Sequence, residues 1–241
     1  CIAIQSNQND QHGGQSIVNF DYGLAPGVAK TYKKLYLVNL KKAAEILAPS
    51  RELSLRDFKT MAAEIEAVSG LKPQLGGNAE YEKLELAKLT ALLGYEDNAR
   101  QAQAFAIKNT EGETDHSTYQ AMEALIHNLN TMHSRAGAQT PFSSINYGMD
   151  TTPEGRMVIK NVLLATEAGL GHGETPIFPI HIFRVKEGIN YNPGEPNYDL
   201  FKLACRVSAK RMFPNFSFLD APFNLQYYKP GHPETEVGYM G

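Results

Sequence analysis

Residues 139–153 read QTPFSSINYGMDTTP and decide the fold, because a β-rich run of nine residues ends there in a glycine-containing loop. The next segment, 154–168, has apolar residues at helical spacing. The alternation then repeats as an apolar strand over 175–185, a helix over 198–212 and a short strand over 215–219. Strands that alternate with helices of this length predict βαβ units and a buried parallel sheet, which is an α/β fold.

The loop over 148–153 is the best candidate for an anion site. Right-handed crossovers place the loops that follow parallel strands on one rim of the sheet, together with residues 186–188. Asp150, Thr151 or Thr152 can cap the helix that follows, and the free amides of a helix N-terminus favour phosphate. We therefore expect Gly148 and these three residues to bind substrate, with a plain capped loop as the alternative.

Polar residues inside the strand before this loop form a second candidate. Alternation puts Ser144 and Asn146 on one face and Ser143 on the other. A buried Asn needs partners, so Asn146 either pairs with neighbouring backbone or contacts a ligand. Near the N-terminus, residues 8–15 read QNDQHGGQ. Paired glycines permit a close backbone approach, so this cluster is expected to line a polar cavity through His12, Gly13 and Gly14.

Composition limits the classes of function. Of the 241 residues 42% are hydrophobic and 20% charged, which is ordinary for a soluble globular protein. A net charge of −3 gives no basic footprint, so we expect no nucleic-acid partner. No apolar run approaches the roughly 20 residues that span a bilayer, and the start does not resemble a signal peptide. We expect a cytoplasmic protein without membrane contact.

The two cysteines, Cys1 and Cys205, form neither a disulfide framework nor a metal motif. Cys205 shares a helical face with Phe201, Ala204 and Ser208, so we expect it to be a small buried residue. The seven histidines also offer no metal set, and none is expected in this chain.

Residues 49–136 are helical in pattern. Ser54 to Asp57 is typical of a helix cap, and Gly70 ends that helix. A second helix ends at Gly94, and a long third one leads to the deciding stretch. A further helix is expected from about Pro26 to Leu47.

Long motifs on both flanks give the chain a family resemblance. Residues 8–15, 139–142 (QTPF), 173–179 (GETPIFP), 209–214 (AKRMFP) and 236–241 (EVGYMG) resemble those of the anaerobic (class III) ribonucleoside-triphosphate reductases. The resemblance implies part of a ten-stranded α/β barrel of the ribonucleotide reductase and glycyl radical enzyme type, with a helical insertion. It implies one incomplete barrel domain: a mainly helical section at 49–136, parallel βαβ units at 137–219, and the ascending arm of a finger loop at 220–241.

The same resemblance implies the reaction. The ribose 2′-hydroxyl of a ribonucleoside triphosphate is replaced by hydrogen, after a radical passes from a backbone glycyl to a cysteine that abstracts the 3′-hydrogen. That cysteine is expected directly after Gly241, so no catalytic residue lies in the chain and the isolated chain is expected to be inactive. The reductant, formate or a thiol protein, stays open.

Cofactors and partners also follow from the resemblance alone. The full enzyme is expected to need a glycyl radical, a structural zinc and an iron-sulfur, S-adenosylmethionine-dependent activating protein. It is expected to be an allosteric homodimer that binds dNTP or ATP effectors, with Lys34 against an effector phosphate. Such an enzyme would serve deoxyribonucleotide synthesis for DNA replication.

Two other functions stay open: a non-catalytic nucleotide-binding or dimerisation piece, and a different glycyl radical enzyme with the same barrel. The ends of the chain also have two explanations, because a fragment of a longer chain and a segment flanked by inteins would both begin at Cys1 and stop at Gly241.

Overall fold

A computed structural model of the chain describes residues 2–10, 14–133 and 139–240. The described residues divide into two compact units. The first, residues 1–26 and 118–241, contains the sheet; the second, residues 27–117, is helical. Within these ranges no helix is both long and apolar enough to cross a membrane.

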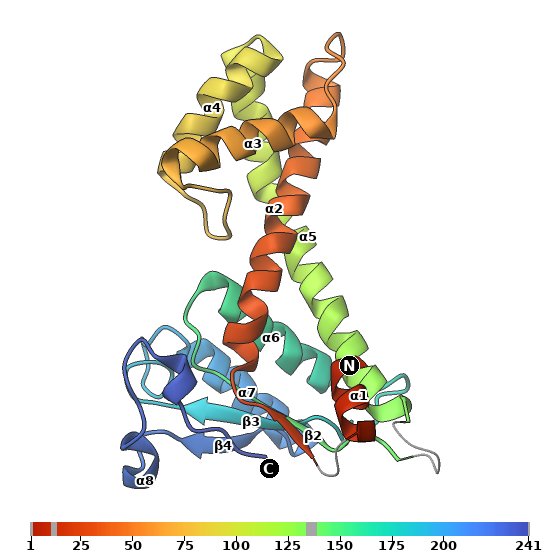
Figure 1. Cartoon of the computed structure of the whole chain (residues 1–241), viewed down its shortest axis with the longest axis vertical. Helices are drawn as coiled ribbons and strands as arrows, with labels where there is room; N and C mark the ends of the chain where they lie inside the picture. Colours follow the sequence, from red (N-terminus) through yellow and green to blue (C-terminus); the bar gives the residue numbers. More distant parts are fainter. Residues whose placement is uncertain (1, 11–13, 134–138, 241) are drawn as a thin grey trace. The chain divides into compact units, whose positions relative to one another are not determined.

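The sheet of the first unit has four parallel strands in the order β1-β2-β3-β4 (Figure 1). These are β1 (Gln15–Ile17), β2 (Ser143–Tyr147), β3 (Ile180–Val185) and β4 (Asn215–Phe218). Helix α6 (Pro153–Ala168) connects β2 to β3, and α7 (Tyr198–Arg211) connects β3 to β4. The prediction of a parallel βαβ sheet is confirmed. The described residues form four strands, so the ten-stranded barrel stays a prediction.

One face of the sheet packs on α6 and α7 and forms the apolar core. Phe183 of β3 lies 6.1 Å, ring centre to ring centre, from Phe201 of α7. His181 is also on this face, between the Tyr147 hydroxyl at 3.0 Å and the Thr166 hydroxyl at 3.3 Å. Complete burial lowers the pKa of His181 to about 3, so the ring is neutral and structural.

Strand boundaries differ from the sequence-based ones. The expected strands over 139–147 and 175–185 are shorter, because regular pairing begins at Ser143 and Ile180. Two elements near the N-terminus were missed: helix α1 (Ile2–Asp10) and β1. The α1 sequence is largely polar, and a three-residue strand is too short to show a periodicity of its own.

The remaining helices are α2 (Phe20–Leu47), α3 (Leu55–Ser69), α4 (Ala79–Leu93), α5 (Glu96–Thr131) and the short α8 (Pro222–Leu225), with a 3-10 turn at Pro233–Thr235. The expected helix signals of the second unit are confirmed. The Ser54 amide donates to the Asp57 carboxylate at 2.7 Å, and Gly70 and Gly94 end α3 and α4 in the left-handed conformation.

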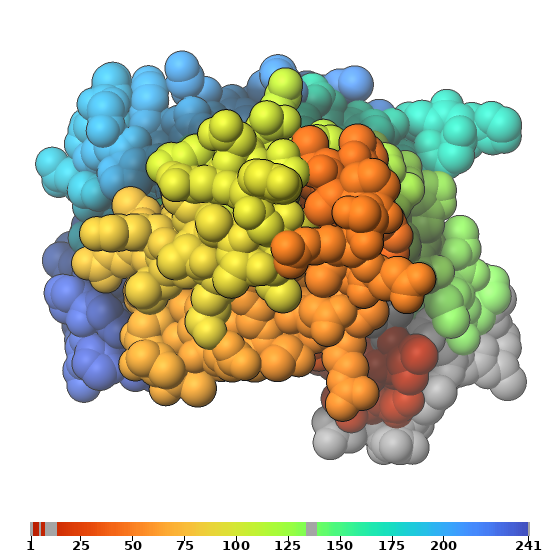
Figure 2. Space-filling model, turned by 90° about the horizontal axis from the view of Figure 1, so that it is seen from above, coloured from red at the N-terminus to blue at the C-terminus, as the bar shows by residue number. Residues whose placement is uncertain are grey.

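The helical unit contains a buried carboxylate. Glu85 of α4 accepts hydrogen bonds from the hydroxyls of Tyr36 at 2.6 Å and Tyr81 at 2.9 Å, and from Gln103 at 2.8 Å. The buried face of α4 therefore runs through Tyr81, Glu85 and Leu89, whereas Leu84 is 43% exposed. Figure 2 looks onto α3 and α4 (orange to yellow), which lie side by side.

The expectation that Cys205 is buried is wrong. Its side chain is exposed, because the buried stripe of α7 runs through Leu200, Ala204 and Val207. Cys205 follows Ala204 directly and is therefore rotated about 100° away from that stripe.

Candidate functional site

The face of the sheet opposite α6 and α7 is polar. Strand alternation places on it Ser16 of β1, Ser144 and Asn146 of β2, Ile182 and Arg184 of β3, and Asn215 and Ser217 of β4. Register pairs these positions directly across the strands, for example Asn146 with Ile182 and Arg184 with Ser217. Buried polar side chains need partners, so a polar face in a sheet interior indicates a site or an internal network.

Much of this face is occupied by the chain itself. Residues 236–240, called here the C-terminal segment, pass over it. The backbone amide of Tyr239 donates to Asn146 Oδ1 at 2.8 Å, and Asn146 Nδ2 donates to the Tyr239 carbonyl at 2.9 Å. The hydroxyls of Ser16 and Ser144 donate to the same carbonyl at 3.1 and 3.3 Å. Asn146 thus pairs with backbone, which is one of the two alternatives that the sequence leaves open, and a contact with a ligand stays a prediction.

Two glycines make room for the segment. A Cβ at Gly14 would lie 2.7 Å from the Met240 methyl and 2.5 Å from the Phe142 ring. A Cβ at Gly238 would lie 2.5 Å from Val18. Gly14 thus permits a close backbone approach, as the paired glycines predict, and the group that approaches it belongs to the chain's own C-terminal segment. His12 and Gly13 lie outside the described residues.

The rim loop after β2 binds an internal carboxylate. The amides of Gly148, Met149 and Asp150 all donate to Asp21 Oδ2, at 2.8, 3.0 and 3.1 Å. Asp21 lies in the first turn of α2 and is fully buried. Successive amides that converge on one oxygen form an anion-binding nest, and here the anion is supplied by the protein.

These three amides are therefore engaged by Asp21, and the binding of a substrate phosphate at this loop stays a prediction. Thr152 also has local partners, because its hydroxyl caps α6 by accepting from the Gly155 amide at 3.1 Å and its own amide donates to Asp150 at 2.9 Å. Gly148 has φ +121°, and a Cβ there would lie 2.8 Å from the Arg184 carbonyl, so a substitution would strain the fold itself. Thr151 is exposed, and its role stays a prediction.

Arg184 connects this loop to the C-terminal segment. The guanidinium is fully buried, with Nη2 3.6 Å from Asp21 Oδ1 and Nη1 2.7 Å from Glu236 Oε2. The second contact is an ion pair by distance but lacks hydrogen-bond geometry. Tyr22 donates to the other Glu236 oxygen at 3.3 Å.

Two carboxylates, Asp21 and Glu236, thus lie beside one buried cation. Burial raises the pKa of Glu236 to about 7; Arg184 opposes the rise, and Asp21 and Asp150 add to it. Burial likewise raises the pKa of Asp150. Desolvation and the like charges of Asp21 and Asp150 raise the pKa of Glu236 more than Arg184 lowers it. The ionised form of Glu236 therefore reduces the free energy of unfolding.

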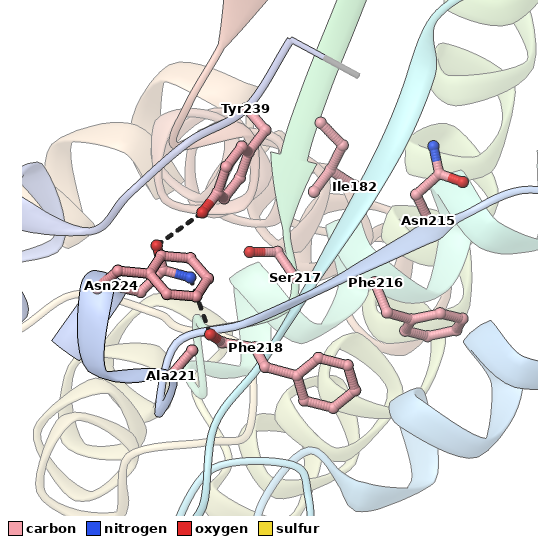
Figure 3. A pocket seen from close by; sticks show the side chains of 9 residues that line it. Ile182, Asn215, Phe216, Ser217, Phe218, Ala221, Asn224 and Tyr239 are labelled. Atoms are coloured by element: carbon pink, nitrogen blue, oxygen red, sulfur yellow. Dashed lines mark hydrogen bonds between the residues drawn. The ribbon is translucent and has the colours of Figure 1, made fainter.

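A cavity of about 450 Å³ opens beside the C-terminal segment (Figure 3). Its polar edge comprises Ser217, Asn215, Asn224 and Tyr239, whose hydroxyl donates to Asn224 Oδ1 at 2.6 Å. The remaining lining is mainly apolar and aromatic: Ile182, Phe216, Phe218, Ala221 and Phe223. Within the part of the chain that the structure describes, the buried Ser217 hydroxyl has no hydrogen-bond partner. Such a group facing a cavity is suited to a ligand.

Sequence reasoning missed several residues of this site. Asp21, Arg184, Ser217 and Glu236 were not singled out, although a charged Arg within an apolar strand was a usable signal. Lys34 lies exposed on α2 in the helical unit, and an effector role stays a prediction. Among the described side chains, no group of three or more His, Cys, Asp or Glu gathers in a way that could hold a metal ion.

Comparison with known proteins gives the family. The sequence profile of the family described as "Anaerobic ribonucleoside-triphosphate reductase" matches residues 1–241. The chain belongs to this family. An anaerobic ribonucleoside-triphosphate reductase of Haemophilus influenzae is 34% identical over 128 residues, which are 51% of this chain and 18% of that protein.

Two further reductases of the same name are similar. The Escherichia coli protein is 34% identical over 126 residues, half of this chain and 18% of its own length. The phage T4 protein is 38% identical over 121 residues, half of this chain and 20% of its own length. The matches to these reductases thus span about a fifth of their length, and the family resemblance seen in the sequence motifs is confirmed.

Proposed function

We propose that the chain forms part of the catalytic barrel of an anaerobic ribonucleoside-triphosphate reductase, which replaces the ribose 2′-hydroxyl of its substrate by hydrogen. The family match and the parallel βαβ sheet support the barrel. In this proposal the polar face of the sheet points into the barrel interior. The C-terminal segment belongs to the ascending arm of the finger loop, residues 220–241, and the radical chemistry is supplied by a cysteine that follows Gly241.

The observation that carries the proposal is the course of the C-terminal segment over the polar face, beside the cavity. Tyr239 belongs to both features, because its backbone pairs with Asn146 and its ring lines the cavity. A residue shortly after Tyr239 would therefore lie close to a molecule bound there.

The cavity is the proposed site of the nucleoside part of the substrate. Its volume of about 450 Å³ lies within the range of roughly 300–1,000 Å³ that is usual for small-molecule sites. Aromatic walls suit a base or the apolar face of a ribose, and the Ser217 hydroxyl can pair with a ribose hydroxyl. Thr151, exposed on the rim, is the remaining candidate of the loop for a phosphate contact.

The partners of the whole enzyme remain part of the proposal. They are a ribonucleoside triphosphate, dNTP or ATP effectors bound near Lys34, a second subunit, and an activating protein that installs the glycyl radical. A structural zinc would lie in a part of the enzyme other than the described residues.

The proposal is tested by anaerobic turnover of the activated, intact protein. Formation of deoxyribonucleoside triphosphate is measured for the wild type, for Ser217→Ala and for Ser208→Ala on α7 as a control. Because the Ser217 hydroxyl has no partner within the described chain, its removal should leave the fold stable. Loss of one hydrogen bond to substrate, about 1.4 kcal/mol, should raise KM about tenfold.

An activated wild-type protein that forms no deoxyribonucleotide would refute the reaction. An unchanged KM for Ser217→Ala would remove the substrate from this cavity. We expect the 241-residue chain alone to form no product under the same conditions, since the proposed radical residues are not in its sequence.

A further inference from the structure

Asn146 makes an unusual two-point contact with the chain. Its side-chain amide accepts from the Tyr239 N–H at 2.8 Å and donates to the Tyr239 carbonyl at 2.9 Å. A neighbouring strand would normally satisfy these two backbone groups. Here one side chain does so, from the middle of a central strand and without solvent exposure.

The chemistry of this contact requires an amide. A carboxylate at position 146 could accept from the Tyr239 amide but could not donate to its carbonyl, and an aliphatic side chain could do neither. Asn146 Nδ2 also lies 3.2 Å from the Ser16 hydroxyl, which itself donates to the Tyr239 carbonyl. The contact is therefore held from both β2 and β1.

Neighbouring contacts fix the same register. Gly238 lies against Val18 where a Cβ would come within 2.5 Å, so a slip by one residue would put Val237 or Tyr239 into a space that admits only glycine. Two residues before, Glu236 reaches Arg184. The Tyr239 hydroxyl is held by Asn224. The segment thus has one allowed position along the polar face.

We infer that Asn146 is a positioning residue, which fixes Tyr239 and thereby the position beside the cavity of the residues that follow it. This inference rests on the proposed function for its catalytic consequence, but its structural part does not. A misplacement of about 1 Å near reacting atoms can cost about 100-fold in rate. Asn146 would act on turnover without contact to the reacting atoms.

Hydrogen exchange of the intact protein tests the structural part. In peptides that cover residues 236–240, the Tyr239 amide should exchange slowly in the wild type and at least tenfold faster in Asn146→Leu. The matched control is Ser143→Ala, three residues earlier on the opposite face of β2, where the hydroxyl donates to the local Pro141 carbonyl at 3.3 Å. Unchanged exchange over residues 181–185 of β3 shows that each variant is folded.

Turnover tests the catalytic part. Asn146→Leu should lower kcat at least tenfold with KM within about twofold, Asn146→Asp should show a smaller loss, and Ser143→Ala should behave as wild type. A lower kcat with a nearly unchanged KM is expected when the catalytic geometry is lost but substrate binding is kept.

The outcomes separate the two proposals. A Tyr239 amide that exchanges as fast in the wild type as in an unstructured peptide, or equally in all variants, overturns the positioning role. So does an unchanged kcat in Asn146→Leu. A wild-type protein that forms no deoxyribonucleotide refutes the proposed function alone, because the exchange experiment still decides the role of Asn146.

Discussion

Glu236 offers a quantitative test of the buried charge cluster. Its pKa rises from 4.5 to about 7 through burial and two neighbouring carboxylates, although Arg184 lies 2.7 Å away. Replacement by glutamine keeps the shape and removes the charge. At about 1.4 kcal/mol for each pH unit, holding the ionised form costs about 3 kcal/mol.

The sign follows from proton binding. Between about pH 4.5 and 7 the folded chain binds a proton at Glu236 that the unfolded chain has released, so stability falls as pH rises through this window. Above about pH 7 the loss is complete. We therefore expect Glu236→Gln to be more stable than wild type by up to about 3 kcal/mol at pH 8, with the difference shrinking toward pH 5.

Urea unfolding of the 241-residue chain at pH 5, 6, 7 and 8 measures this difference. Glu187→Gln, at an exposed position, is the control and should not show the pH-dependent gain. The reasoning is refuted if Glu236→Gln is destabilising at pH 8, or if its difference from wild type is the same at pH 5 and pH 8. Either result would mean that the Arg184 ion pair outweighs desolvation.

Two further predictions concern packing around the rim loop. Asp21→Ala should lower the free energy of unfolding, measured in urea, by about 3–5 kcal/mol, because three amides and the Arg184 guanidinium lose a buried anion. The control Asp220→Ala, at an exposed ion pair, should lower it by less than about 1 kcal/mol. Gly155→Ala should cost about 1–3 kcal/mol, because its Cβ would lie 2.1 Å from the Asp150 carboxyl. Gly112→Ala, with nothing within 4 Å of the new methyl, should instead stabilise α5 by about 0.5–1 kcal/mol. Equal effects of the two glycine substitutions would contradict the close approach at Gly155.

The sequence by itself determined the parallel sheet and most helix ends. These depend on neighbours within a few residues: the apolar periodicity of 154–168, the cap at Ser54, and the glycines at 70 and 94. The long motifs also indicated the family, and the family match over residues 1–241 confirms it.

Only the tertiary structure decided how the polar residues are used. Asn146 and Tyr239 are 93 residues apart, and Asp21 lies 127 residues before Gly148. Nothing in local spacing shows that the amides of Gly148 to Asp150 already bind a carboxylate, or that Asn146 binds backbone. Helical spacing likewise could not show which side of α7 faces the sheet, and Cys205 was misplaced for that reason. Hydrogen bonds between distant segments depend on how βαβ units stack, and periodicity carries no information about that.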